Sequence, residues 1–256
     1  AIREGWLPPE LIFSHPGFLP ACHRSLPEGR RWLIFHGVDL ARGPDGVIRA
    51  YGDRAQSPSG AGYTLENRII LARALPMIYR DAPLRRLASF LETERATLAR
   101  LAPHHPENPH VVLLTPGPSS PVYFEHAYLA NYLSLSLVEG EDLVVRDGRV
   151  WLKTLGGLRP VDVIMRRVAD PLCDPLELRG DSLLGVPGLL QAVRGDRVAL
   201  ANALGSAVVE NPGLVAFLPQ LSHHLLGEEL KLPSLATWWC GNPADRSYVL
   251  ANLDRL

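Results

Sequence analysis

Two aspartates stand where they could share a metal ion. Asp39 and Asp53 each follow a segment with the pattern of a β-strand, and the turn signal at residues 43–46 joins the two segments into a predicted hairpin over residues 32–51. Because paired strands lie side by side, both carboxylates could approach one point. Carboxylate oxygens suit Mg²⁺, and substrate phosphates complete the coordination shell of this ion. The alternative is that both side chains cap turns or face solvent.

A loop of small residues follows the hairpin, Ser57-Pro58-Ser59-Gly60-Ala61-Gly62-Tyr63, and leads into a predicted helix. Small side chains expose backbone N–H groups, and a loop that enters a helix N-terminus can hold an anion. No lysine follows the glycines, so this segment is not a Walker loop. The alternative is an ordinary loop, for which Ser, Gly and Pro are the usual residues.

Further candidates lie at the ends of predicted strands. Glu125 begins the helix after the strand 111–115, and ligands of open α/β sheets bind at the carboxyl ends of strands. Glu125 could instead only complement the helix dipole. The strand 161–165 runs into Arg166 and Arg167. Adjacent strand residues point in opposite directions, so one arginine could enter a cleft while the other forms a surface ion pair.

Histidine and cysteine provide no metal or catalytic pattern. The histidines at 104–105 and 223–224 are adjacent pairs, which make poor joint metal ligands on a helix. Cys22, Cys173 and Cys240 are widely spaced and form no CxxC pair, which argues against a disulfide framework and a structural zinc site. We expect three buried thiols instead.

Composition and charge exclude several classes of protein. Lys plus Arg is 26 and Asp plus Glu is 27, giving a net charge of −1, which argues against nonspecific nucleic-acid binding. The apolar fraction of 46% and the charged fraction of 21% are typical of a globular chain. No apolar run reaches the roughly 18 residues of a spanning helix. We therefore expect a cytoplasmic protein with no nucleic-acid partner and no membrane.

The apolar pattern changes at the polar stretch 103–109, which predicts two domains, 1–105 and 106–256. Before this stretch, helical spacing is found over 65–75 and 84–101. After it, a hairpin is predicted around Asp147-Gly148, and buried strands alternate with helices. These segments are 111–115, 121–133, 135–138, 161–165, 183–193 and 198–201. The alternation predicts an α/β fold with a Rossmann-like parallel sheet.

Eight segments together resemble the circularly permuted ATP-grasp proteins of type 2, a largely uncharacterised bacterial family similar to the synthetase domain of glutathionylspermidine synthase. The resemblance covers essentially the whole chain. Its segments are HGVDL (36–40), DRAQSPSGAGYTLENR (53–68), YFEHAYLANYL (123–133), LVEGEDLVVRDG (137–148), VDVIMRR (161–167), DPLELRGDSLLGVPGLL (174–190), ALANALGSAVVENPGLVAFLP (199–219) and TWWCG (237–241).

The resemblance implies a partial, circularly permuted ATP-grasp fold. Residues 110–219 would form a Rossmann-like pre-ATP-grasp domain, and residues 1–101 would belong to the displaced ATP-grasp core. It also implies a ligase that uses ATP and Mg²⁺ to join a carboxylate to an amine through an acyl phosphate. The expected partners are a small-molecule or peptide carboxylate and an amine.

The resemblance also implies site residues. Asp39 matches a magnesium-site aspartate, Ser59 matches a residue beside the acceptor carboxylate, and Glu125 matches a residue of the substrate pocket. Together with the residues singled out above, the candidate catalytic residues are Asp39, Arg54 and Arg166, and the candidate metal ligands are Asp39 and Asp53. The candidate substrate-binding residues are Ser57, Ser59, Gly60, Asn67, Arg68, Glu125 and Asn202.

Two departures from the glutathionylspermidine synthase pattern concern the metal site. Gly37 stands where an arginine precedes the first aspartate, and Gly52 and Arg54 stand in place of a carboxylate–x–Asn pair. Asp53 could take the metal role from the next position, and Arg54 could stabilise phosphate charge.

The resemblance places the nucleotide-binding lysine and a glycine-rich lid after Leu256, so we expect this chain alone not to catalyse ligation. The alternative is a degenerate, noncatalytic ATP-grasp scaffold that binds a peptide or a partner protein. A plain Rossmann-type binding module is disfavoured, because no GxGxxG follows the strand 111–115.

Overall fold

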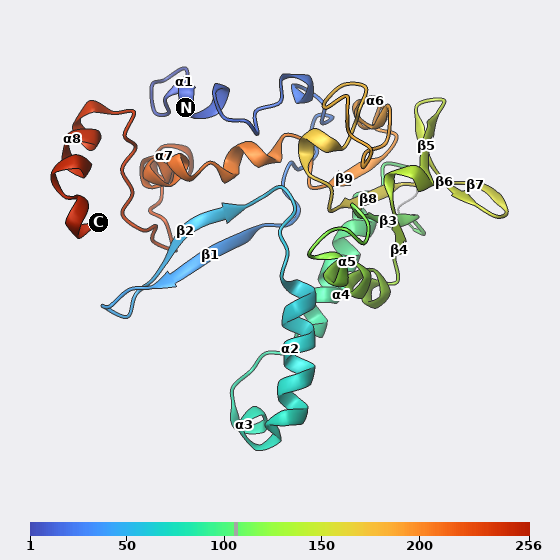
Figure 1. Ribbon diagram of the computed structural model, residues 1–256, viewed down its shortest axis with the longest axis horizontal. Helices are drawn as coiled ribbons and strands as arrows, with labels where there is room; N and C mark the ends of the chain where they lie inside the picture. The colour runs from blue at the N-terminus through green and yellow to red at the C-terminus, as the bar shows by residue number, and fades with distance from the viewer. Residues whose placement is uncertain (105–106) are drawn as a thin grey trace. The chain divides into compact units, whose positions relative to one another are not determined.

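The computed structural model describes residues 1–104 and 107–256, and it has a mixed α/β architecture with one parallel and two antiparallel sheets (Figure 1). The chain divides into two compact units that alternate along the sequence. The first, here called the hairpin unit, comprises residues 1–18, 36–55 and 206–256. The second, here called the sheet unit, comprises residues 19–35 and 56–205.

The sheet unit contains a four-stranded parallel sheet in the order β4-β3-β8-β9. Parallel strands are covered on both faces, which is why their sequences are continuous apolar runs. The prediction of buried parallel strands in this region is confirmed. Its assignment as a Rossmann-like domain stays a prediction. The strands are β3 (Val111–Leu114), β4 (Ser136–Val138), β8 (Val163–Arg166) and β9 (Ala199–Ala201).

Alternate residues of the strands belong to two separate hydrophobic cores, because successive side chains of a strand point to opposite faces of the sheet. Val112 and Ile164 belong to one core, which includes residues of α6 (Leu189–Arg194). Leu113 and Met165 belong to the other. This second core is covered by three helices, α2 (Ala61–Ala74), α4 (Ala88–Arg100) and α5 (Tyr123–Leu133). α3 (Pro76–Asp81) follows α2.

A three-stranded antiparallel sheet also belongs to the sheet unit, with the strands β5 (Leu143–Arg146), β6 (Arg149–Thr154) and β7 (Gly157–Pro160). The predicted hairpin around Asp147-Gly148 is confirmed, and both turn residues have positive φ, 52° and 70°. The sequence did not predict β7, because its four residues are all exposed and show no alternation.

The hairpin unit contains β1 (Gly37–Arg42) and β2 (Ile48–Arg54), together with α1 (Pro9–Phe13), α7 (Leu218–Leu226) and α8 (Pro243–Ala251). The predicted hairpin over 32–51 is present but displaced along the chain. Residues 32–35 were expected to be its first strand, and this expectation is wrong. The backbone groups of these residues bond to positions 202–203 within the sheet unit instead of pairing with β2.

Helix boundaries shift where glycine or proline interrupts the pattern. The segment 183–193 becomes helical only from Leu189, after Gly188 with φ 82°. Pro212–Ala216 forms a 3-10 helix, and α7 begins only at Leu218. The 3-10 segments are Pro20–Cys22, Gly140–Asp142, Asp170–Leu172, Ser206–Glu210, Pro212–Ala216 and Leu253–Arg255.

The predicted domain boundary between residues 105 and 106 lies outside the described residues, and the division into 1–105 and 106–256 stays a prediction. The three cysteines are free thiols. Cys22 and Cys173 are buried as expected, but Cys240 is exposed. In the part of the chain that the structure describes, no helix is both long enough and apolar enough to cross a membrane.

Candidate functional site

The register of the β1–β2 hairpin separates the two candidate metal ligands. Asp39 lies opposite Gly52, and Asp53 lies opposite Val38. Neighbouring residues of a strand point to opposite faces. Asp39 and Asp53 therefore project from opposite faces of the hairpin, and the expectation that both carboxylates approach one point is wrong.

Each of these carboxylates has its own cationic or donor partner. Oδ2 of Asp39 accepts from Nε of Arg54 at 2.9 Å and lies 2.7 Å from its Nη2. The neighbouring carboxylate of Asp39 raises the pKa of the Arg54 guanidinium. On the other face, Oδ1 of Asp53 lies 2.9 Å from Nε2 of His36. The hairpin thus carries two separate polar pairs instead of one acidic cluster.

Within the sheet unit, the loop before α2 holds the carboxylate of Glu125. Oε1 of Glu125 accepts from the backbone N–H of Gly60 at 2.6 Å and of Gly62 at 3.0 Å. A Cβ at position 62 would lie 2.8 Å from Cγ of Glu125, so only glycine fits there without a shift. The loop amides do hold an anion, and this anion is the chain's own fully buried Glu125.

Arg167 binds the same loop from the end of β8, by donating from Nη1 to the carbonyl oxygen of Pro58. Burial lowers the pKa of this guanidinium, and the nearby carboxylates of Glu125 and Glu94 oppose that shift. Among the described residues, Nε of Arg167 and Oε2 of Glu125 have no hydrogen-bond partner. A buried polar atom left unpaired costs about 1–3 kcal/mol, so a polar group that paired with either atom would gain free energy.

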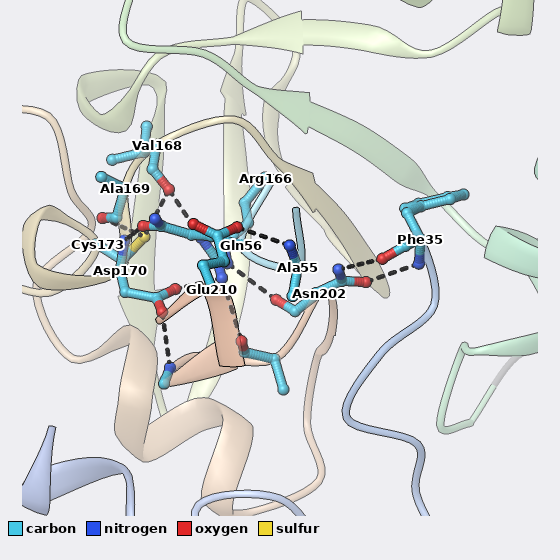
Figure 2. Close-up of polar contacts among 12 residues, drawn as sticks. Phe35, Ala55, Gln56, Arg166, Val168, Ala169, Asp170, Cys173, Asn202 and Glu210 are labelled. Carbon is cyan, nitrogen blue, oxygen red and sulfur yellow. Dashed lines mark hydrogen bonds and ion pairs between the residues drawn. The ribbon is translucent and has the colours of Figure 1, made fainter. Parts of the chain in front are cut away.

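Arg166, the neighbour of Arg167, is buried on the other side of the strand (Figure 2). Its guanidinium donates to the carbonyl oxygens of Asn202 at 2.9 Å, Val168 at 3.0 Å and Ala203 at 3.1 Å, and pairs with Asp170. The expected ion pair of one arginine is confirmed, because Arg166 pairs with Asp170, but this pair is buried instead of lying on the surface. These contacts favour a structural role for Arg166, and its catalytic role stays a prediction.

Asn202 connects the end of β9 to a distant segment of the sheet unit. Figure 2 shows its carboxamide pointing toward the backbone of Phe35. Oδ1 accepts from the N–H of Ile34 at 2.7 Å and of Phe35 at 2.9 Å, and Nδ2 donates to the carbonyl of Phe35 at 2.7 Å. Figure 2 also shows a bond inside the hairpin unit, where the N–H of Ala55 donates to Glu210.

Most of the remaining predicted substrate-binding residues lie in the loop 57–63 or just after it. We call this segment the Glu125 loop, because its backbone amides bind the side chain of Glu125. Ser57 and Gly60 are partly buried and Ser59 is exposed, all in the loop itself. Asn67 is exposed on α2, whereas Nη1 of Arg68 is buried and has no partner among the described residues. The structure therefore places Gly60 against Glu125, and it places the side chain of Asn202 against Ile34 and Phe35.

Sequence reasoning assigned no role to two buried residues near Glu125, Glu94 and His126. Glu94 is 6% exposed, and burial raises the pKa of its carboxyl group. His126 is also buried, and its Nδ1 lies 2.9 Å from Oγ1 of Thr115. Burial first, and then the charge of Arg167, lower the pKa of His126 to about 4. The signal for Glu94 was its position on α4, on the face that also carries the buried leucines 91 and 98.

Comparison with known proteins identifies the family. The model of the circularly permuted ATP-grasp type 2 family matches residues 1–256. The chain belongs to this family. It is 44% identical over 255 residues to an uncharacterised protein of Mycobacterium tuberculosis and 40% identical to one of Synechocystis. The whole chain aligns with each of them, but it spans only 29% and 53% of their lengths.

ATP-grasp proteins generally bind ATP with Mg²⁺. Residues 1–104 and 107–256 contain no group of three or more His, Cys, Asp or Glu side chains arranged to hold a metal. Asp39 and Asp53 lie on opposite faces, and Arg54 already binds Asp39. The predicted metal pair of this ATP-grasp chain therefore does not fit a magnesium ion.

The Asn202 contacts predict a large loss of stability on truncation. We expect Asn202→Ala to lower the free energy of unfolding by about 2–4 kcal/mol, because three hydrogen bonds are lost and three backbone groups lose their partner. Asn131→Ala, at an exposed position of α5, is the matched control and should change it by less than about 0.5 kcal/mol. Urea unfolding followed by circular dichroism measures both. Equal effects would contradict the structural role of Asn202.

The depressed pKa of His126 predicts a pH-dependent stability. Unfolded His126 takes up a proton near pH 6.5, but the folded protein resists this until about pH 4. The stabilising contribution is therefore present above about pH 6.5 and is lost as the pH falls toward 4, by roughly 1.4 kcal/mol per pH unit at most. Urea titrations between these pH values should show that the free energy of unfolding falls as the pH falls. His126→Gln should remove this contribution to the slope of the free energy against pH.

His23→Gln is the control for this experiment, because His23 is exposed. It should retain the slope of the unsubstituted chain. Glu94, whose raised pKa gives a contribution of opposite sign, is present in all three proteins and cancels from the comparison. An unchanged slope in His126→Gln would show that His126 is not the group that resists protonation.

Proposed function

We propose that the complete protein is an ATP-dependent ligase that joins a carboxylate to an amine. The match of the whole chain to the ATP-grasp family carries this proposal. In the reaction, a carboxylate oxygen attacks the γ-phosphorus of ATP, which gives an acyl phosphate and ADP. The amine then attacks the carbonyl carbon, inorganic phosphate leaves, and the amine nitrogen loses a proton to give the amide. Such chemistry depends on positioning and charge neutralisation.

We propose that the Glu125 loop binds the carboxylate substrate. It contains the predicted residues Ser57, Ser59 and Gly60, and it lies at the carboxyl ends of parallel strands, where α/β proteins bind ligands. The guanidinium groups of Arg68 and Arg167 are suited to carboxylate oxygens. A small-molecule or peptide carboxylate is the proposed substrate, with an amine as second substrate. We propose no nucleic-acid or membrane partner.

The nucleotide is proposed to need sequence beyond these 256 residues, which span about half or less of the relatives' lengths. Within the chain, Asp39 and Arg54 form one ion pair on an open hairpin face, and Arg54 supplies positive charge there. We propose that this pair acts as a unit in the complete protein, in which Asp39 orients the guanidinium of Arg54.

A noncatalytic ATP-grasp scaffold that binds a peptide or a partner protein is the second candidate. One observation favours it. The two carboxylates expected to form the metal site face away from each other, and Gly37 and Gly52 provide no replacement ligand on either strand. A protein of this kind would retain the fold and its binding surfaces without turnover.

Calorimetric titration of Mg-ATP separates the two candidates. The complete gene product and the 256-residue chain are titrated in parallel. Binding by the complete product but not by the chain supports the ligase and a nucleotide site shared with other sequence. Absence of binding in both would contradict the ligase proposal and favour the scaffold.

Substitution of Asp39 tests the proposed ion pair in the complete protein. We expect Asp39→Asn to reduce phosphate release from ATP, in the presence of pooled carboxylates and amines, to the background rate. The physical reason is that a neutral amide holds the Arg54 guanidinium only by weaker hydrogen bonds without charge assistance. Asp45→Asn, which breaks the exposed Asp45–Arg49 pair in the same hairpin, should leave the rate unchanged. Unchanged turnover in Asp39→Asn would remove Asp39 from the mechanism.

A further inference from the structure

One face of the β1–β2 hairpin has an unusual composition. Gly37, Asp39, Gly52 and Arg54 share this face, because the register pairs Gly37 with Arg54 and Asp39 with Gly52. We refer to these four residues as the Asp39 face. Two of its four positions carry no side chain. Its polar groups are therefore one carboxylate and one guanidinium on neighbouring strands.

The guanidinium of Arg54 binds one oxygen of the Asp39 carboxylate. Nε and Nη2 of Arg54 both approach the same oxygen, Oδ2 of Asp39, at 2.9 Å and 2.7 Å. Charge-assisted bonds of this length are about twice as strong as neutral ones. A divalent cation that bound Oδ2 would have to displace the guanidinium and also overcome the repulsion of its positive charge.

No second protein carboxylate on this face compensates for that cost. Asp53 points to the other face, where it pairs with His36. Gly52 lies opposite Asp39, and a Cβ built there would be 3.1 Å from Oδ2, so a carboxylate at position 52 would lie beside Asp39. Mg²⁺ gives up its water reluctantly and is held by one or two carboxylates together with substrate phosphates.

We propose that Arg54 takes the place of a divalent cation at Asp39, so that this face carries a built-in positive charge and excludes divalent cations. An arginine remains charged at all relevant pH values, so this charge does not depend on the metal concentration. Arg54 is then the residue that determines the cation specificity of the hairpin. The proposal concerns metal binding to the free protein and does not rest on the proposed ligase activity.

Manganese is the probe, because the six-line electron paramagnetic resonance signal of free Mn²⁺ falls when the ion binds. The complete gene product is titrated with Mn²⁺ without nucleotide, beside Asp39→Asn and the control Asp45→Asn. We expect the three titrations to coincide. A Mn²⁺ site in the unsubstituted protein that Asp39→Asn removes and Asp45→Asn retains would overturn the proposal.

A gain of binding is the complementary test. Gly52→Asp combined with Arg54→Asn places a second carboxylate beside Asp39 and removes the guanidinium. We expect this double variant to gain a Mn²⁺ site at least tenfold tighter than any that the unsubstituted protein shows, and the further change Asp39→Asn should abolish it. Circular dichroism verifies that each variant is folded. A folded double variant that gains no site would overturn the assignment of Arg54 as the group that excludes the cation.

The outcomes also separate this inference from the ligase proposal. A Mn²⁺ site at Asp39 in the unsubstituted protein contradicts the role of Arg54 and leaves ATP-dependent ligation intact. Failure of the complete gene product to bind Mg-ATP contradicts the ligase and leaves the cation-excluding face intact. The two experiments therefore fail independently.

Discussion

The burial of Arg166 constrains the carboxyl end of the parallel sheet. A guanidinium inside a protein must bond nearly all of its donors, because an unpaired buried charge costs several kcal/mol. Arg166 meets this requirement by binding the carbonyl oxygens of Val168, Asn202 and Ala203 and the carboxylate of Asp170. These bonds fix the chain after β8 and the chain after β9 in one arrangement. The side chain of Asn202 is thereby positioned to bind Ile34 and Phe35.

The Glu125 loop lies at the same end of the sheet. Alternation along the strand sends Arg166 into the network with Asp170 and leaves Arg167 to bind Pro58. Glu125 then accepts two amides of the glycine loop, and Glu94 lies near enough to influence Arg167 electrostatically. The loop is thus held by one anion and one cation. This explains how a segment rich in glycine and serine can be ordered next to a candidate substrate site.

In the hairpin unit, a difference of one position along β2 decides whether a carboxylate lies on the same face as Asp39. A carboxylate at position 52 would stand beside Asp39, whereas the carboxylate at position 53 stands on the opposite face. Because side chains of a strand alternate, a shift of one position moves the group to the other side of the sheet. Arg54 returns to the Asp39 face and binds the carboxylate there. The acidic residues of the hairpin are therefore not interchangeable, although they are close in sequence.

Local patterns were enough to determine part of this protein from its sequence. The continuous apolar runs predicted the buried parallel strands, and Asp147-Gly148 predicted its hairpin, because burial on both faces and positive φ each demand particular residue types. The combined motifs also identified the family, which the comparison confirmed.

Only the tertiary structure decided which side chains meet. Whether Asp39 and Asp53 converge depends on strand register, and the partner of Asn202 lies 168 positions away at Ile34. The sequence pattern around 32–35 resembled a strand, but its backbone groups found partners at positions 202–203 instead of in β2. Such pairings arise from the need to satisfy buried polar groups across the fold, and no local spacing encodes them.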